Sequence, residues 1–349
     1  MKALLAALLA LAICAALTGC STHRKELDRE APPESSPAQS TGEVASMTIS
    51  LLESEASRIN VLSSEALAPL TEAASIAFKR TGSTRAFALT RQFAKGLLAA
   101  QVTRGGVSGF FGASSGAAPQ AQITALSGLA LAGAYGDTRE SKDRVAALAA
   151  ASDVTSPTLG WVSSPVGVGV ATAPGGHRAN VAMTANAALL LKRAGELGAP
   201  GAFAKYRAAL HTVYSSQAAV GRWHENVGGH TPMSLGEWGM TLFDLSADGS
   251  KESLGIVGGG VPALYANTFE ADGQLRKSSA TDNQPTGVAL ALRALAAYQD
   301  SSLADAAFGK LTERRRPNGT ISLAEADDTV SQAYFALAYA QLLAGRAGS

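Results

Sequence analysis

Five side chains in the loops of this chain are suited to acid–base chemistry. Histidine titrates near neutral pH, and a carboxyl group in an apolar site can hold or release a proton, so both residue types can transfer protons to or from a bound substrate. If the protein is an enzyme, we expect its catalytic residues to be His177, His224, Glu225, Glu237 and Asp327.

The same loops carry side chains suited to binding. Tryptophan offers a flat apolar surface, arginine neutralises carboxylates, and short polar side chains exchange hydrogen bonds. Two adjacent pairs, His177–Arg178 and Glu237–Trp238, are the hardest to explain as packing and are the first choices for ligand contact. The expected binding residues are Trp161, Arg178, Trp223, His230, Trp238, Asp282 and Asn283.

Structural roles compete with binding at several of these positions. Trp161 and Trp223 occupy a place that Leu275 and Ile321 fill elsewhere in the chain, which favours packing over ligand contact. Asp282 stands near an expected helix start, where an aspartate often caps the helix.

A metal site is a further alternative for the second loop. His224, Glu225 and His230 could bind a metal together with Asp282, but the spacing of the two histidines matches no helical ligand pair and the loop is rich in glycine. We therefore expect neither a metal nor a cofactor.

These loops must be positioned by helices, and one stretch holds a complete structural unit. In Thr286–Tyr298 only Arg293 is charged and apolar residues lie all round the helical wheel, which is typical of a buried helix. In Ser301–Arg315 apolar residues recur every fourth position among charged ones, which predicts an outer helix with one wet face. The turn Pro317–Gly319 then ends the outer helix, and an apolar residue, Ile321, follows.

The same unit recurs along the chain. A glycine just before a large apolar residue appears at Gly109/Phe111, Gly160/Trp161, Gly221/Trp223, Gly273/Leu275 and Gly319/Ile321, and these apolar residues are 46 to 62 residues apart. Each is followed by an expected inner helix: Thr124–Tyr135, Thr184–Leu197, Leu235–Ser246, Thr286–Tyr298 and Val330–Leu343. Repetition with this period predicts stacked helical hairpins.

The buried helices favour a closed ring over an open superhelix, because they need neighbours on both sides. The turns "SQAAVGRW" and "TERRRPNGTI" and the repeated Thr-Ala-Leu helices resemble the α/α-toroid repeats of terpene cyclases and protein prenyltransferases, an architecture that several polysaccharide lyases share. The resemblance covers Thr84–Gly345 and implies an all-α fold, an α/α toroid of about six helical hairpins. It implies a fold and no particular reaction.

Closure of the ring needs an outer partner for the last inner helix, after which the chain ends. Glu43–Arg80 has helical spacing, and we expect Pro69 to interrupt it. This segment could supply the missing partner, with Ala86–Ala99 then forming the first inner helix.

The N-terminus resembles a bacterial lipoprotein signal peptide. An apolar run ends in Leu17-Thr18-Gly19-Cys20, which implies cleavage after residue 19 and acylation of the Cys20 thiol. We expect a signal peptide over 1–19, a lipidated flexible tether over 20–42, and the toroid domain over 43–349. The protein would then be exported to the cell envelope as an outer-membrane lipoprotein facing the periplasm or the cell surface.

Two features of the whole sequence limit which partners and cross-links we expect. Cys14 lies in the expected signal peptide, so the mature chain would hold one cysteine and no disulfide. The formal net charge of +1, with no basic cluster beyond Arg314–Arg316, argues against nucleic acid as the partner.

One acidic segment resembles a known catalytic motif. Glu325–Thr329 is similar to the Asp-x-Asp-Asp-Thr motif of class II terpene cyclases, with glutamate in the first position. In that family a carboxylic acid protonates an alkene or an epoxide. Asp328, immediately before a helix, is most simply an N-cap.

The favoured interpretation is a non-enzymatic, membrane-anchored domain that binds a cell-envelope polymer or protein, because the glycine-rich interruptions Gly167–Gly176 and Gly258–Gly260 suggest degenerate repeats. The alternative is a polysaccharide lyase or hydrolase with His177 or His224 as base, Arg178 neutralising a uronate, and Glu225 or Glu237 as acid. A second alternative is a degenerate terpene cyclase-like protein.

Overall fold

The structure, a computed structural model, describes residues 39–104, 107–112, 120–164, 166–173, 175–276, 285–298, 301–316, 320–323 and 328–346. All of them fall in one compact unit, Ser36–Ser349. The expected signal peptide and Cys20 lie outside the described residues, and the first described helix already begins at Thr41.

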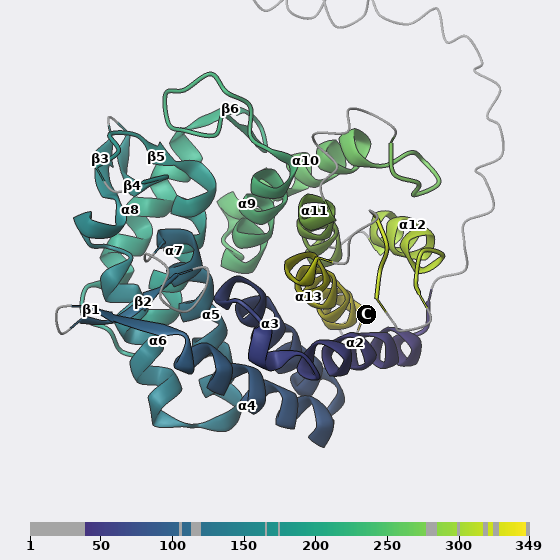
Figure 1. Ribbon diagram of the computed structural model, residues 1–349. Helices are drawn as coiled ribbons and strands as arrows, with labels where there is room; N and C mark the ends of the chain where they lie inside the picture. The colour runs from purple at the N-terminus through teal and green to yellow at the C-terminus, as the bar shows by residue number, and fades with distance from the viewer. Residues whose placement is uncertain are drawn as a thin grey trace, which may run out of the picture. The chain divides into compact units, whose positions relative to one another are not determined.

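Six of the helices that the structure describes form an inner ring (Figure 1). In chain order they are α3 (Ser64–Thr81), α5 (Ala121–Thr138), α7 (Val181–Glu196), α9 (Leu235–Asp248), α11 (Pro285–Ala297) and α13 (Thr329–Arg346). Each packs against the next, and α13 packs against α3. The predicted α/α toroid is therefore confirmed, closure included.

A second ring of helices surrounds the first and alternates with it along the chain. It consists of α2 (Thr41–Ala56), α4 (Thr84–Ala99), α6 (Ser141–Asp153), α8 (Ala202–Ser215), α10 (Lys251–Thr268) and α12 (Ser301–Thr312). Short 3-10 turns, Ile59–Val61 and Pro157–Leu159, precede α3 and β3. Among the described residues, no helix has both the length and the apolar character to cross a membrane.

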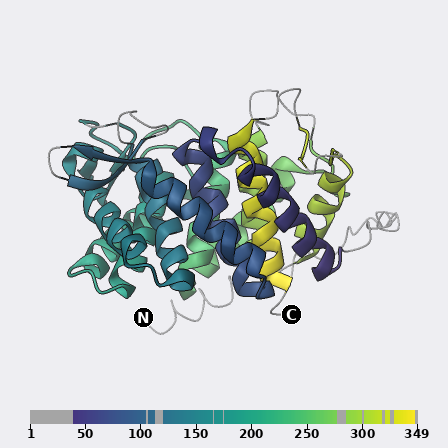
Figure 2. The same cartoon turned by 60° about the horizontal axis from the view of Figure 1, so that its bottom comes forward.

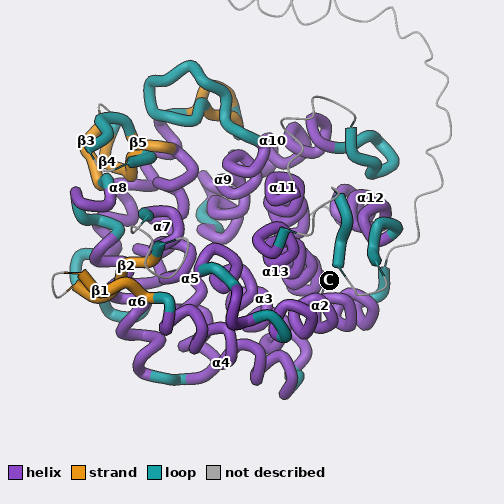
Figure 3. Tube along the Cα trace, viewed as in Figure 1, coloured by secondary structure: helices purple, strands orange, loops and turns teal. Residues whose placement is uncertain are grey.

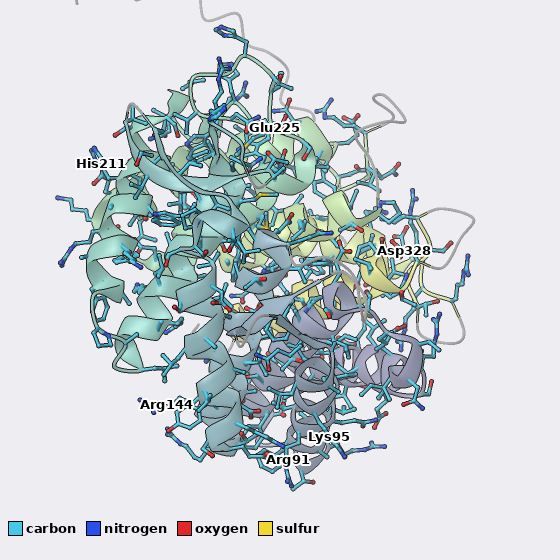
Figure 4. The ribbon with its side chains drawn as sticks, turned by 60° about the vertical axis from the view of Figure 1, so that its left-hand side comes forward. Arg91, Lys95, Arg144, His211, Glu225 and Asp328 are labelled. Carbon is cyan, nitrogen blue, oxygen red and sulfur yellow. The ribbon has the colours of Figure 1, made fainter. Side chains whose placement is uncertain are left out.

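The N-terminal segment supplies the outer partner of α13, as predicted, because α2 packs against α13. The prediction that Ala86–Ala99 is an inner helix is wrong: α3 takes that place and α4 lies outside it. The reason lies in the charges of α4: Arg85, Arg91 and Lys95 are exposed, and an inner helix could not accommodate them. Figure 4 shows Arg91 and Lys95 on the outside of the ring.

The expected interruption at Pro69 is also wrong. Pro69 is buried inside α3, and the chain breaks instead between α2 and α3, where Ser63 caps the new helix by accepting from the backbone N–H of Ala66. A proline removes one helical hydrogen bond. The packing of α3 against α13, α5 and α4 outweighs that loss.

Short strands occur in three of the connections that lead from an outer helix to the next inner helix (Figure 3). They pair as β1–β2, β3–β4–β5 and β6–β7, all antiparallel. These long connections lie at one end of the ring and the short ones at the other (Figure 2). The strand bounds are Gln101–Arg104, Val107–Phe111, Trp161–Ser164, Gly167–Ala171, Ala179–Asn180, Gln217–Ala219 and Arg222–Trp223.

The repeated apolar residue of each turn has a common structural role. Phe111, Trp223, Leu275 and Ile321 each pair with a residue just after the preceding outer helix. Gly221 has φ +66°, and a side chain there would collide with the backbone of α10. Glycine is therefore required where this turn approaches the neighbouring helix.

An ion pair between a buried arginine and a half-buried glutamate joins two inner helices near the axis of the ring. The guanidinium of Arg293 on α11 donates to the Glu72 carboxylate on α3 at 2.5 Å and lies 3.4 Å from the centroid of the Phe243 ring on α9. The Arg293 side chain is 3 % exposed. A charge this deep is tolerated because it is paired and rests on an aromatic face.

A buried acid, Asp244, lies close to this pair. The Asn186 amide on α7 donates to the Asp244 carboxyl on α9 at 2.6 Å. Burial raises the pKa of Asp244 to about 7, although the hydrogen bond from Asn186 and the charge of Arg293 both oppose the rise. Asp244 is thus largely protonated in the folded chain at mildly acidic pH.

Ring closure predicts a cooperative response to truncation. Deleting residues 330–349 removes α13 and exposes the apolar sides of α3, α11 and α2, so the sharp thermal transition should be lost rather than shifted slightly. Calorimetry and circular dichroism test this, with deletion of residues 347–349 as the control. A truncated chain that still melted sharply, near the parent Tm, would contradict closure as a stability requirement.

The raised pKa of Asp244 predicts that the folded chain loses stability as pH rises. Its unfolded-state pKa is about 4, so between about pH 4 and 7 the unfolded chain releases a proton that the folded chain keeps, and stability falls as pH rises. The Asp244→Asn side chain cannot ionise. The Tm of this variant minus the Tm of the parent should therefore become larger as pH rises from 4 to 8. The exposed Glu252→Gln is the control, and a constant Tm difference would contradict the buried titration.

Candidate functional site

The long connections form a rim around the amino-terminal ends of the inner helices, and nine of the predicted site residues are described there. His177 and Arg178 are exposed in a bend just before β5. Their accessibility is compatible with ligand contact. His211, in contrast, lies on the outer helix α8, as expected for a residue set apart from the site (Figure 4).

The connection between β7 and α9 brings two of the predicted histidines together. The rings of His224 and His230 are 6.0 Å apart in an edge-to-face arrangement. Glu225 lies between them in sequence and is held by its backbone, which accepts from the N–H of Val181 at 3.0 Å and donates to Thr231 at 2.8 Å. Its half-buried side chain belongs to the same rim.

Glu237 is tied to two helix starts. One carboxylate oxygen completes the capping box of α9 with Ser234, and the other accepts from the Asn180 amide at 3.0 Å. Asn180 itself caps α7 by accepting from the N–H of Met183 at 2.9 Å. Glu237 thus joins α7 to α9, and this placement favours a structural role.

The three tryptophans also serve packing. Trp223 is buried, and its indole N–H donates to the carbonyl of Val213 at 2.8 Å. Trp238 donates to Gly221 at 2.7 Å, and its half-buried ring lies 5.5 Å from the guanidinium of Arg222. Trp161 is half-buried at the start of β3. For Trp223 the burial favours the packing explanation given above.

Three predicted rim residues, Asp282, Asn283 and Asp327, lie outside the described residues. Within the part of the chain that the structure describes, no group of three or more His, Cys, Asp or Glu side chains is placed to hold a metal ion. The pair His224 and His230 therefore has no third described ligand.

The structure adds a carboxyl group that the sequence analysis missed. Glu65 lies in the first turn of the inner helix α3, whose amino-terminal end is surrounded by the rim. Burial, followed by the negative charge of Asp328, raises the pKa of the Glu65 carboxyl. Asp328 caps α13, as expected, by accepting from the N–H of Val330 at 3.1 Å and from the Ser331 hydroxyl at 2.8 Å.

A phenol extends this pair toward the axis. Tyr334 on α13 is buried, and burial and the charge of Glu65 raise the pKa of its hydroxyl. The structure thus places the Glu65 carboxyl, whose pKa is raised, the Asp328 carboxyl and the buried Tyr334 phenol at the inner end of the rim. Such a set can donate a proton to a leaving group and stabilise developing charge nearby.

A separate cavity of about 600 Å³ lies at the other end of the ring. The carboxyl-terminal halves of the inner helices line it, and Glu72 and Phe243 lie in its wall. The paired Arg293 stands next to these two residues.

Comparison by sequence identifies no relative: no family model matches the chain, and no curated protein matches it. Comparison of the fold finds similar solved structures. An α-1,6-mannanase of glycoside hydrolase family 76 from Salegentibacter sp. superposes with a TM-score of 0.64 at 13 % identity, over 87 % of this chain and 99 % of the mannanase.

Two other similar structures belong to different carbohydrate-active classes. A family 88 glycosyl hydrolase from Bacteroides vulgatus has a TM-score of 0.64 at 12 % identity, covering 88 % of this chain and 100 % of its own. A polysaccharide lyase has a TM-score of 0.65 at 11 % identity, covering 88 % and 98 %. At these identities the likeness establishes the fold, which is the α/α toroid of these hydrolases and lyases.

Proposed function

We propose that this protein is a carbohydrate-active enzyme that cleaves polysaccharide at the rim of its toroid. The sequence favoured a non-enzymatic binding domain, with a lyase or hydrolase as the alternative. The similar hydrolase and lyase structures support the alternative over the binding domain. Two similar mannanase structures hold mannose oligosaccharides, and both are variants described as inactive after replacement of two aspartates.

The observation that carries the proposal is the Glu65–Asp328 pair. Cleavage of a glycosidic bond commonly uses two carboxyl groups, one protonated to donate to the leaving oxygen and one ionised. Glu65 meets the first requirement because burial and a neighbouring negative charge both favour its protonated form. Asp328 supplies the second carboxyl group, and its oxygens accept hydrogen bonds from the Val330 N–H and the Ser331 hydroxyl.

Within this proposal the rim residues bind the chain of sugars. His177 and Arg178 are exposed, and Arg178 is suited to a uronate carboxylate. The rings of His224 and His230 lie close together in the connection that precedes α9. Hydrolysis is the preferred reaction, since the described acid is a carboxyl group; a lyase would need a base such as His177 or His224.

We also propose export and lipid attachment at Cys20, with anchoring in the outer membrane. This part rests on the N-terminal sequence alone. An envelope location would suit an enzyme that meets polysaccharides outside the cytoplasm.

Replacing the proposed acid tests the reaction. Glu65→Gln should lower the rate of cleavage by about a hundredfold or more, the usual contribution of general acid catalysis, with little change in Tm. The substrates are α-1,6-mannan and a panel of uronate-containing polysaccharides, with release of reducing ends as the measurement. Glu252→Gln, on the exposed face of α10, should be unchanged. Wild-type protein that binds a polymer without cleaving it would restore the binding interpretation.

The pH profile tests the partner of the acid. Activity that needs protonated Glu65 falls as pH rises through the Glu65 pKa. Asp328→Asn keeps a capping side chain and removes the negative charge that raises this pKa, so the fall should move to lower pH. An unmoved profile would show that Asp328 does not tune the acid.

Cys20→Ala tests attachment. The change removes the sulfur that would carry the lipid, so the protein should leave the membrane fraction or accumulate as an uncleaved precursor. Incorporation of radiolabelled fatty acid is the direct measurement. Labelling that persisted in Cys20→Ala would contradict the proposed anchor.

A further inference from the structure

The cavity at the carboxyl-terminal end of the inner helices is large enough to hold a small molecule. Its volume is about 600 Å³, within the range of known ligand sites. All six inner helices contribute to its lining. It lies at the end of the ring opposite the rim, so it is distinct from the site proposed above.

The wall of this cavity is mainly apolar. Ile76, Leu129, Leu189 and Phe243 supply large side chains. Gly133 lacks a side chain, and an added Cβ there would meet nothing closer than the Ser75 hydroxyl at 3.6 Å. A sugar enclosed by such a wall would leave hydroxyl groups without partners, whereas an alkyl chain would bury its surface favourably.

The polar part of the lining contains three basic side chains, Lys79, Arg80 and Arg193. The two acids in the lining already have partners: Glu72 is paired with Arg293 and Glu196 with Arg193. Lys79 is 3.3 Å from Asp137.

One basic group is left over. Arg80 is exposed at the end of α3, and none of the ion pairs or hydrogen bonds among the described residues involves it. Its positive charge is available to a ligand. The carboxyl ends of helices carry partial negative charge and would by themselves favour a cation, so a preference for anions depends on these basic side chains.

We propose that this cavity binds an anionic amphiphile, a molecule with one carboxylate or phosphate headgroup and an alkyl chain. The headgroup lies against Arg80, supported by Lys79 and Arg193. The chain runs inward along Ile76 and Leu189 toward Phe243, where the Arg293–Glu72 pair closes the axis. This site is independent of the proposed polysaccharide chemistry.

Calorimetric titration of the full chain tests the ligand class. Laurate and dodecyl phosphate, below their micelle concentrations, should bind at one site per chain. Dodecyltrimethylammonium should bind at least about tenfold more weakly, since one charge-assisted contact accounts for roughly that factor. Acetate and inorganic phosphate, which lack the chain, should not compete. Equal binding of the alkyl cation, or full competition by inorganic phosphate, would overturn the proposal.

Two matched glycine variants test the location. Gly133→Leu fills the cavity with a side chain that the backbone accommodates, so laurate binding should be lost while Tm is unchanged or raised. Gly258→Leu adds the same side chain on the exposed face of α10, where an added Cβ meets nothing within 4 Å, and should bind normally. Arg80→Gln should weaken laurate about tenfold and leave the alkyl cation unweakened. Unchanged laurate binding in Gly133→Leu would place the ligand elsewhere and refute the inference.

Discussion

The contact between α13 and α3 is the constraint on which the rest of this fold depends. It joins the last inner helix to the first, so each inner helix is covered on both sides and can be apolar over most of its surface. The chain achieves this by using its first described helix, α2, as the outer partner of its last. Closure also brings ionisable groups to the axis, where Arg293, Glu72 and Asp244 meet from three different helices. They remain there because each has a partner within reach.

The sequence predicted most of this architecture because the two kinds of helix differ in charge. Five inner helices could be recognised from their uniform apolar character, and the glycine turns marked the start of each long connection. The first hairpin was assigned wrongly because the pattern at residues 64–81 is interrupted by Pro69 and by Glu65, Glu72 and Lys79. These three charges are spaced seven residues apart on α3 and face the axis or its two ends, so they resemble the wet face of an outer helix.

The same ambiguity explains what was missed in the site. The sequence analysis favoured polar and aromatic residues in loops as site residues. In the structure, Glu237 and Asn180 join the starts of two helices, and Trp223 is buried in packing contacts. Glu65 was overlooked because an acidic residue in the first turn of a helix has the same local sequence pattern whether it stabilises the helix end or belongs to a site. Its pKa is raised by burial and then by the charge of Asp328, a residue that is distant in sequence and becomes a neighbour only when the ring closes. The lone charge of Arg293 stood out in an otherwise apolar helix, but only the structure shows that it pairs with Glu72 near the axis.

The place where the chain enters the ring has a directional consequence. Arg346, at the end of α13, donates to the backbone carbonyl of Gln39, so entry occurs at the carboxyl ends of the inner helices. The long connections project from the opposite end. A pulling force transmitted through the N-terminal segment would therefore act on α2 and its contact with α13 first and reach the rim last. In mechanical terms, the point where the described chain enters the ring and the rim of long connections are at opposite poles of the ring.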